Sequence, residues 1–278
     1  MASPSPGRLD ILITRAALVR SMEIRVHKPE DLKGSMLLIG FPSRGLVGGV
    51  AATFVIDELK MWQIASLQDP RLPPTMVIKD GVGYSPIQFY VSAERCGPDG
   101  TCDKLVACIS EVPFNPELLG EVAWTIVTWA KKEGVAQIVV LEGVESTTPG
   151  GAKGNGKSKA PVIRGVRSIS SKHSLTKYKI PKVPEGVVSG YASAFLLAAN
   201  ALDVDLVTLF IEARADLPDA HAAAFLLKVV DPMLPHIDFE SKRLEARAVQ
   251  LETDMKRSIK TTTRQLAAMR RTTDLMYQ

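Results

Sequence analysis

Short, uninterrupted apolar runs alternate with segments of helical spacing along this chain, and this alternation constrains the fold more than any other feature. Three runs, at 35–41, 136–144 and 206–213, are typical of strands buried on both faces. The segments with helical spacing lie at 42–60, 115–134, 189–205 and 216–234. Such an alternation predicts an α/β fold in which helices cover both faces of a largely parallel sheet.

A second group of short apolar runs comes without helices between them. These runs lie between Trp62 and Cys108 and are separated by turn residues, so we expect them to be strands and part of the sheet to be antiparallel. Strand-like alternation begins at Met22, and we expect the residues before it to form a partly disordered arm. The predicted organisation is an arm (1–21), an α/β domain (22–237) with a flexible loop at about 146–162, and a C-terminal helix with its tail (238–278).

The C-terminal region differs in pattern from the rest of the chain. From residue 238 to about 273 it has no Gly or Pro and is rich in helix-forming residues. Leu244, Leu251, Met255 and Ile259 form an apolar stripe with near-heptad spacing. A stripe of this size predicts packing against the domain or another subunit, so we expect a homo-oligomer.

Composition excludes several classes of protein. The net charge of +4 and the aromatic content of 6% are too low to favour nucleic-acid binding. No apolar run reaches the roughly 18 residues that cross a bilayer, and the first residues lack the apolar core of a signal peptide. Three cysteines without framework spacing favour a reducing compartment, so we expect a cytoplasmic protein without a membrane partner.

Two glycine-rich segments resemble ligand-binding loops. Gly151–Ser158 matches the phosphate-loop pattern G-x-x-x-x-G-K-[ST], but no strand directly precedes it and Pro161 prevents a helix after it. We therefore interpret this segment as a flexible connector. Gly40–Gly49 joins a buried strand to a helix without the register of G-x-G-x-x-G. Its glycines are interpreted as allowing close packing of the helix on the sheet, in preference to ligand binding.

The cysteines and histidines form no recognisable metal motif. Cys96, Cys102 and Cys108 are each six residues apart, wider than the usual ligand pairs. Their spacing favours plain thiols over the alternative of a surface disulfide between Cys96 and Cys102. The four histidines, which form no metal-binding pair, are His27, His173, His221 and His236.

Ser110 and Glu111 lie at the end of a predicted strand, which is a possible position for an active site. The sequence assigns them no His or Asp partner, and no Ser lies in a G-x-S-x-G turn. It therefore predicts no catalytic residue, no metal and no cofactor.

Several motifs, taken in order, resemble the proteasome assembly chaperone family, especially its archaeal members. They are "LLIGFPSRGLVGGVAATFVIDELKM", "LPP", "KDG", "SEVP", "VVLEGV", "GYASAFLLAANALDVDLVTLFIEA" and "PDAHAAAFLLKVVDPML". The resemblance covers about residues 22–237. It implies a three-layer α/β/α sandwich with a topology similar to nucleoside phosphorylases but without their chemistry. It also implies binding to the α ring of the proteasome core particle through the C-terminus.

The chain ends Met276–Tyr277–Gln278, which fits the hydrophobic–Tyr–any-residue tail implied by that resemblance. A tyrosine buries a flat ring and satisfies its hydroxyl at a pocket rim, and a terminal carboxylate can be captured by a basic group. Several such tails on one oligomer gain affinity through multivalency. The expected partners are proteasome α subunits, further copies of this chain and a related paralogue.

Two classes of function follow from the sequence. The leading one is a non-enzymatic proteasome assembly chaperone or docking factor, with gate activation as a variant of it. The alternative is an enzyme with a phosphorylase-like fold that binds a small molecule or a nucleotide. Fold analogy is weak evidence for enzymatic activity, so we expect a protein that is not an enzyme.

Overall fold

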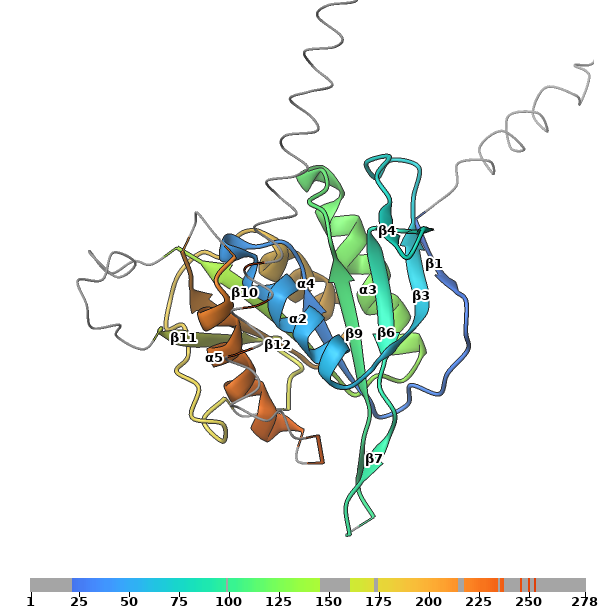
Figure 1. Cartoon of the computed structure of the whole chain (residues 1–278). Helices are drawn as coiled ribbons and strands as arrows, with labels where there is room; N and C mark the ends of the chain where they lie inside the picture. Colours follow the sequence, from blue (N-terminus) through green and yellow to red (C-terminus); the bar gives the residue numbers. More distant parts are fainter. Residues whose placement is uncertain are drawn as a thin grey trace, which may run out of the picture.

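The computed structural model describes residues 22–98, 100–145, 161–172, 175–214, 218–234 and 236–237, and positions 246, 250 and 253. Its centre is one eight-stranded sheet in the order β1-β3-β6-β9-β2-β10-β12-β11 (Figure 1). The strands are β1 (Glu23–Val26), β2 (Met36–Gly40), β3 (Trp62–Gln68), β6 (Ile87–Val91), β9 (Leu105–Ser110), β10 (Gln137–Val144), β11 (Ile163–Arg167) and β12 (Leu206–Glu212). The four central strands, β9, β2, β10 and β12, are parallel.

The flanking strands are antiparallel to their neighbours. The mixed sheet expected from the sequence is therefore confirmed, with its parallel part at the centre. The central strands are buried on both faces, as their continuous apolar runs predict.

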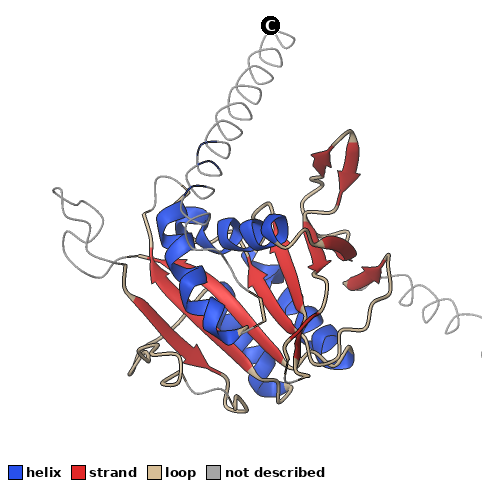
Figure 2. Cartoon of the chain, turned by 60° about the horizontal axis from the view of Figure 1, so that its bottom comes forward, coloured by secondary structure: helices blue, strands red, loops and turns tan. Residues whose placement is uncertain are grey.

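Helices cover both faces of the sheet, which gives the α/β/α layering (Figure 2). The helices α2 (Val47–Glu58) and α5 (Ala220–Val230) share one apolar core with one face. The helices α3 (Leu119–Lys132) and α4 (Tyr191–Ala201) share a second core with the other face. None of the helices described is both long and apolar enough to cross a membrane.

The helix predicted at 115–134 corresponds to the short turn η2 (Pro116–Leu118) and α3, and both of its ends have recognisable capping residues. Asn115 Oδ1 accepts a hydrogen bond from Glu117 N at 3.0 Å, at the start of η2, which leads into the helix. Gly134 adopts φ = 76° just past the last turn, where the left-handed conformation favours glycine. The predicted start and end of this helix are thus confirmed.

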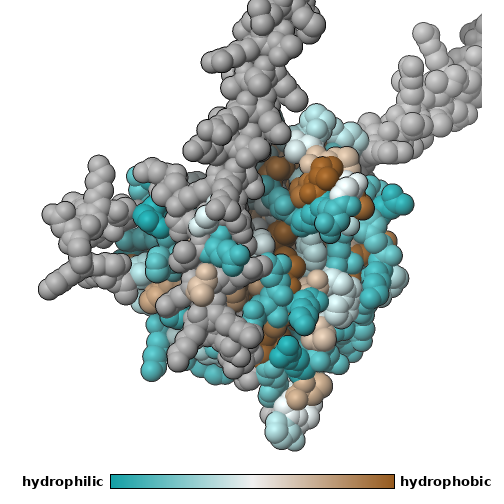
Figure 3. Space-filling model, in the orientation of Figure 1, coloured by the Kyte–Doolittle hydropathy of each residue, from teal (hydrophilic) through white to brown (hydrophobic). Residues whose placement is uncertain are grey.

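Two small hairpins extend from the sheet. The strands β4 (Val77–Lys79) and β5 (Val82–Tyr84) are joined by Asp80–Gly81, both with positive φ, as a tight hairpin turn requires. Figure 3 shows apolar side chains exposed over this hairpin, where Met76 and Ile78 are 62% and 65% exposed. The second hairpin consists of β7 (Arg95–Cys96) and β8 (Cys102–Asp103).

The predicted loop, which ends at about residue 162, is followed directly by a strand that the sequence did not predict. Residues Ile163–Arg167 form β11, which pairs antiparallel with β12 at the edge of the sheet. Pro161 and Gly165 exclude a helix here but are compatible with an edge strand, because a proline before the strand and a glycine within it leave the ladder to β12 intact. The rest of the predicted loop, at 146–160, lies outside the described residues.

The predicted C-terminal helix also lies almost wholly outside the described residues. The three positions described within it, Ala246, Gln250 and Thr253, are α-helical. The stripe residues Leu244, Leu251, Met255 and Ile259 are outside the described part, so the stripe remains a prediction.

Candidate functional site

The natural place for a ligand in a sheet of this topology is the crevice between β2 and β10, where the order of the parallel strands reverses. The loop after β2 approaches this point with Ser43, whose Oγ accepts a hydrogen bond from Gly143 N at 2.9 Å. A Cβ placed on Gly143 would collide with the carbonyl group of Arg44. On the α2 side of the crevice, the loop after β2 and the end of β10 are thus in direct contact.

The glycines at the start of α2 have different surroundings. A Cβ on Gly48 would lie 2.5 Å from Leu141 O and 3.1 Å from Phe41 O. Gly45 adopts φ = 62°, and a Cβ there would lie 2.8 Å from Arg214 O. Close packing therefore explains both residues, as the sequence predicted. The same interpretation is wrong for Gly49, because nothing lies within 4 Å of its hypothetical Cβ.

An aromatic cluster closes the α4 side of the crevice. Phe41 contacts Phe114, Tyr191 and Phe195 edge to face, with ring centroids 5.9, 5.4 and 5.7 Å away. Phe41 is 2% exposed and Phe195 is fully buried. Edge-to-face pairs of this kind stabilise a packed core, so these rings form a packed cluster on this side of the crevice.

Glu142 is the titratable group that the sequence analysis missed. It lies near the end of β10 and is 8% exposed, and its Oε2 accepts a hydrogen bond from Ala192 N at 2.6 Å, in the first turn of α4. Burial raises the pKa of this carboxyl to about 7, although the Ala192 N–H partly offsets the effect. Burial and the Glu142 charge together raise the pKa of the neighbouring Tyr191. In the sequence, Glu142 is marked only by being the single acidic residue within the apolar run "VVLEGV".

Ser110 and Glu111, the predicted strand-end pair, are engaged in structural contacts. Ser110 Oγ donates to Val112 O at 2.7 Å. Glu111 Oε1 lies 2.7 Å from Lys79 Nζ, which also donates to Tyr90 Oη at 3.3 Å. Burial lowers the pKa of Lys79, but the Glu111 carboxylate outweighs it and the net shift is upward. These contacts attach the β4–β5 hairpin to the sheet and do not form a nucleophile–base pair.

The histidines are spread over the molecule. His27 Nε2 lies 2.9 Å from Ser66 Oγ beside β1, and His221 is exposed on the first turn of α5. His236 contacts Thr101 through Nε2 at 2.6 Å. His173 lies outside the described residues.

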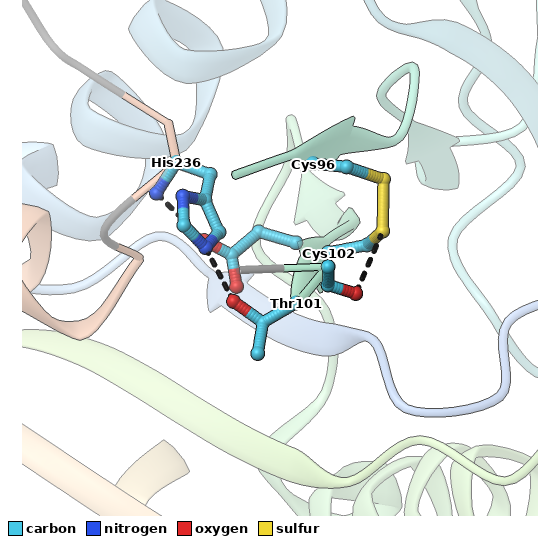
Figure 4. The surroundings of a disulfide bond; sticks show 6 residues. Cys96, Thr101, Cys102 and His236 are labelled. Carbon is cyan, nitrogen blue, oxygen red and sulfur yellow. Dashed lines mark hydrogen bonds between the residues drawn. A yellow bond between two sulfur atoms is a disulfide. The ribbon is translucent and has the colours of Figure 1, made fainter. Parts of the chain in front are cut away.

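The preference for plain thiols at Cys96 and Cys102 is wrong. These residues form a disulfide across the β7–β8 hairpin, with Cα atoms 4.0 Å apart (Figure 4). The turn in "CGPDGTC" brings the two strands into direct register, which sequence separation alone does not reveal. Within the described part of the chain, Glu94 and these two sulfurs form the one group close enough to share a metal ion. The disulfide leaves neither sulfur available as a thiolate ligand.

The third cysteine follows the expectation. Cys108 is a free, fully buried thiol in β9. Burial raises the pKa of this thiol well above its usual value, which makes it unreactive.

The predicted docking residues Met276, Tyr277 and Gln278 lie outside the described residues, as does the segment Gly151–Ser158. What the structure does place is the point from which the C-terminal segment departs. We call His236 and Ile237 the root of that segment. Ile237 is 1% exposed in the core shared by α2 and α5, and His236 N donates to Asp103 Oδ2 at 2.8 Å. The segment therefore starts from a fixed position on the domain.

The mixed eight-stranded sheet, with an apolar core and a pair of helices on each face, defines an α/β/α protein. A family model described as the PAC2 family matches residues 37–259. The chain belongs to the PAC2 family, which confirms the resemblance seen in the sequence.

Known proteins with similar sequence or structure agree with this assignment. An uncharacterized protein of Methanocaldococcus jannaschii is 22% identical over 237 residues, covering 84% of this chain and 90% of that protein. PbaA of Pyrococcus furiosus, described as an archaeal homolog of proteasome-assembly chaperone, has a TM-score of 0.66 at 24% identity, covering 92% of this chain and 100% of PbaA. PbaB of the same organism, described as an archaeal proteasome activator, has a TM-score of 0.67 at 20% identity, covering 86% of this chain and 98% of PbaB. At these identities the structural matches establish the shared fold.

Proposed function

We propose that this protein is a non-enzymatic assembly chaperone or activator of the proteasome that docks on the α ring of the core particle through Met276–Tyr277–Gln278. The observation that carries the proposal is the joining of a PAC2-family domain to a C-terminus of the hydrophobic–Tyr–any-residue type. The descriptions of PbaA and PbaB as chaperone homolog and proteasome activator support the same class of function. The proposed setting is the cytoplasm, with further copies of this chain or a related paralogue as additional partners.

The crevice supports the non-enzymatic part of the proposal. Phe41 and its aromatic neighbours fill one side, and Ser43 with Gly143 fills the other. An enzyme of this fold would need an accessible pocket with converging acid, base or nucleophile groups. Ser110, Glu111 and Glu142 instead make hydrogen bonds or ion pairs that hold main chain or neighbouring elements in place. We therefore favour the non-enzymatic function over the alternative of a small-molecule enzyme, for which the buried Glu142 carboxyl is the one described candidate group.

The proposed anchors are tested by changing the tail alone. Tyr277→Ala removes the ring and hydroxyl, deletion of Met276–Gln278 removes every anchor, and residues appended after Gln278 move the carboxylate. Each change should weaken binding to immobilised α rings by about tenfold or more in surface plasmon resonance, because a buried aromatic anchor dominates a small interface and multivalency multiplies each loss. The melting temperature should stay unchanged, since a chain end contributes little to a core.

Gln278→Ala is the matched control, because it keeps the main-chain carboxylate in place and should bind almost as the natural protein does. Binding of the truncated protein with unchanged affinity would show that the tail is not the anchor. Adding the protein to complete core particles tests whether it opens their gate. Adding it to free α subunits tests whether it promotes assembly.

A further inference from the structure

The β7–β8 hairpin is a disulfide-closed extension of the sheet. It continues β6 and β9 beyond their last paired residues and projects from the bottom of the molecule (Figure 1). Cys96 and Cys102 are directly paired across it, and both are exposed. Exposed disulfides are the ones that a reductant can reach, whereas buried structural disulfides resist reduction.

The hairpin also contacts the root of the C-terminal segment, far away in the sequence. His236 Nε2 lies 2.6 Å from Thr101 Oγ1, and His236 N donates to Asp103 Oδ2 at 2.8 Å (Figure 4). Thr101 and Asp103 are the two residues on either side of Cys102. Both hydrogen bonds therefore depend on the position that the disulfide gives to Cys102.

We propose that the Cys96–Cys102 disulfide is a redox-modification site that controls how firmly the hairpin holds His236, and hence how the C-terminal segment is presented to its partner. The contact between the hairpin and His236 does not require any partner. The effect on the partner rests on the proposed function, because it assumes that the tail docks on the α ring.

The physical basis is the weakness of the hairpin without its cross-link. A two-stranded hairpin gains little stability in water from its own ladder. The described ladder of this one is Arg95↔Asp103 and Cys96↔Cys102, beyond the Ser92 N–Leu105 O hydrogen bond at its base. Its described turn contacts are Gly97 N to Thr101 O at 2.8 Å and Gly100 N to Gly97 O at 3.1 Å. Opening the disulfide lets the strand that carries Thr101 and Asp103 fluctuate, so both hydrogen bonds to His236 weaken.

The domain itself does not depend on this hairpin. Ile237 is 1% exposed in the core and keeps its apolar contacts when the hairpin loosens. Leu234 is 3% exposed and anchors the chain on the other side of His236. The switch therefore changes the order of His236, the part of the root that the hairpin holds, without unfolding the sheet.

The chemical step is thiol–disulfide exchange with a dithiol reductant. A thiolate of the reductant attacks one sulfur of the pair, the Cys96–Cys102 bond breaks, and a mixed disulfide forms. The second thiol of the reductant then releases the protein. Two electrons and two protons pass to Cys96 and Cys102, and the reductant becomes a disulfide.

Amide hydrogen exchange of the full-length protein, resolved at single residues, tests the first part of the proposal. Dithiothreitol should speed exchange at the His236 amide by about three- to tenfold, the factor expected for one net hydrogen bond. The amides of Ile39 and Val139, in β2 and β10, should not change. In the double variant Cys96→Ser/Cys102→Ser, the His236 amide should exchange fast with or without dithiothreitol. In Asp103→Ala, the same amide should exchange fast although the disulfide remains intact.

An unchanged rate at His236 on reduction would overturn the proposal. So would a response of the double variant to dithiothreitol, because the effect would then arise elsewhere.

Binding to immobilised α rings tests the second part. Reduction should weaken binding of the natural protein by about three- to tenfold, because the docking segment loses preorganisation, and the double variant should bind weakly in both states. Equal binding of the oxidised and reduced protein would overturn the regulatory role. Deletion of Met276–Gln278 separates the two proposals. If that deletion leaves binding intact, the tail hypothesis fails, whereas the exchange rate at His236 still decides whether the disulfide holds the root.

Discussion

At the scale of single residues, Gly48 and Gly49 are neighbours in α2 with opposite environments. A Cβ at position 48 would press on Leu141 O, whereas position 49 is open. We predict that Gly48→Ala lowers the free energy of unfolding by about 1–3 kcal/mol through overpacking. Gly49→Ala should raise it by up to about 1 kcal/mol, because alanine is the better helix former. Denaturant titration of the two variants checks the pair, and equal effects would show that α2 does not approach β10 this closely.

Glu142 gives the stability a defined pH dependence. Its folded-state pKa of about 7 lies above the ordinary value of 4.5, so the native state binds the proton more tightly than the unfolded chain. The resulting stabilisation is complete below pH 4.5 and is lost as the pH rises to about 7, at about 1.4 kcal/mol per pH unit at most. Glu142→Gln, which keeps an oxygen acceptor for Ala192 N, should remove this slope from the curve of unfolding free energy against pH.

The exposed Glu185 is the matched control for this measurement, and Glu185→Gln should leave the slope as it is in the natural protein. Retention of the slope in Glu142→Gln would assign it to another group.

The sequence predicted some of these residue roles and missed others for a physical reason. The packing role of Gly48 follows from its place where a buried strand turns into a helix, which is visible in the sequence. The raised pKa of Glu142 depends on α4, some fifty residues later, covering the end of β10. The Cys96–Cys102 pairing likewise depends on strand register. Local patterns carry no direct information on such contacts.

At the scale of elements, the first turn of α5 depends on Asp219. Its Oδ1 accepts from Ala222 N at 3.1 Å, and the same carboxylate accepts from Arg214 N, Nε and Nη2. Burial would raise the pKa of Asp219, but these hydrogen bonds lower it below its usual value. We predict that Asp219→Ala costs about 1–2 kcal/mol of unfolding free energy as a lost helix cap, measured by thermal and denaturant unfolding.

Asp219→Asn keeps the capping oxygen and should recover much of that loss at neutral pH. The aspartate contribution is present above the ordinary pKa of 3.8 and disappears as the pH falls through the lowered value. The natural protein and Asp219→Asn should therefore converge in strong acid. If Asp219→Ala is as stable as the natural protein, the cap contributes nothing.

Elements with a strong local pattern were predicted, and elements that depend on a neighbour were not. The parallel strands β2, β10 and β12 and the helices α2, α3, α4 and α5 follow from continuous apolar runs and helical spacing. The parallel pairing of β9 with β2 was not predicted, because β9 belongs to the group of strands without intervening helices. The strand β11 was missed because "VIRGV" is short and is interrupted by Arg164 and Gly165, and only its pairing with β12 at the sheet edge makes it a strand. The β7–β8 ladder has too few residues to show an alternating pattern, so the sequence does not mark its two strands.

At the scale of the whole molecule, the domain combines a rigid sheet with a C-terminal segment that starts from a fixed point. Ile237 is buried and His236 is hydrogen-bonded to the β7–β8 hairpin, so the segment leaves the domain in a defined place. A short tail has low affinity by itself, and a fixed origin reduces the conformational entropy lost on docking. This arrangement suits a protein that presents several tails to a ring, provided that several copies assemble.

Assembly is therefore the last prediction, and the stripe of the C-terminal helix is its proposed basis. Leu244, Leu251, Met255 and Ile259 would expose a continuous apolar surface on a lone helix, which soluble monomers rarely do. We expect multi-angle light scattering at micromolar concentration to give several times the subunit mass of 30.1 kDa. The double variant Leu251→Ser/Met255→Ser should reduce that mass, whereas Gln250→Ser, a change at an exposed helical position away from the stripe, should not.

The same variants separate assembly from docking. A dissociated Leu251→Ser/Met255→Ser protein keeps its tail, so each subunit should still bind an α ring, but with the roughly 10²–10⁴-fold multivalent gain removed. Deletion of Met276–Gln278 should leave the oligomer intact and remove the docking contacts. A natural protein that scatters light as a monomer would contradict the prediction, and the affinity for the α ring would then have to come from a single tail.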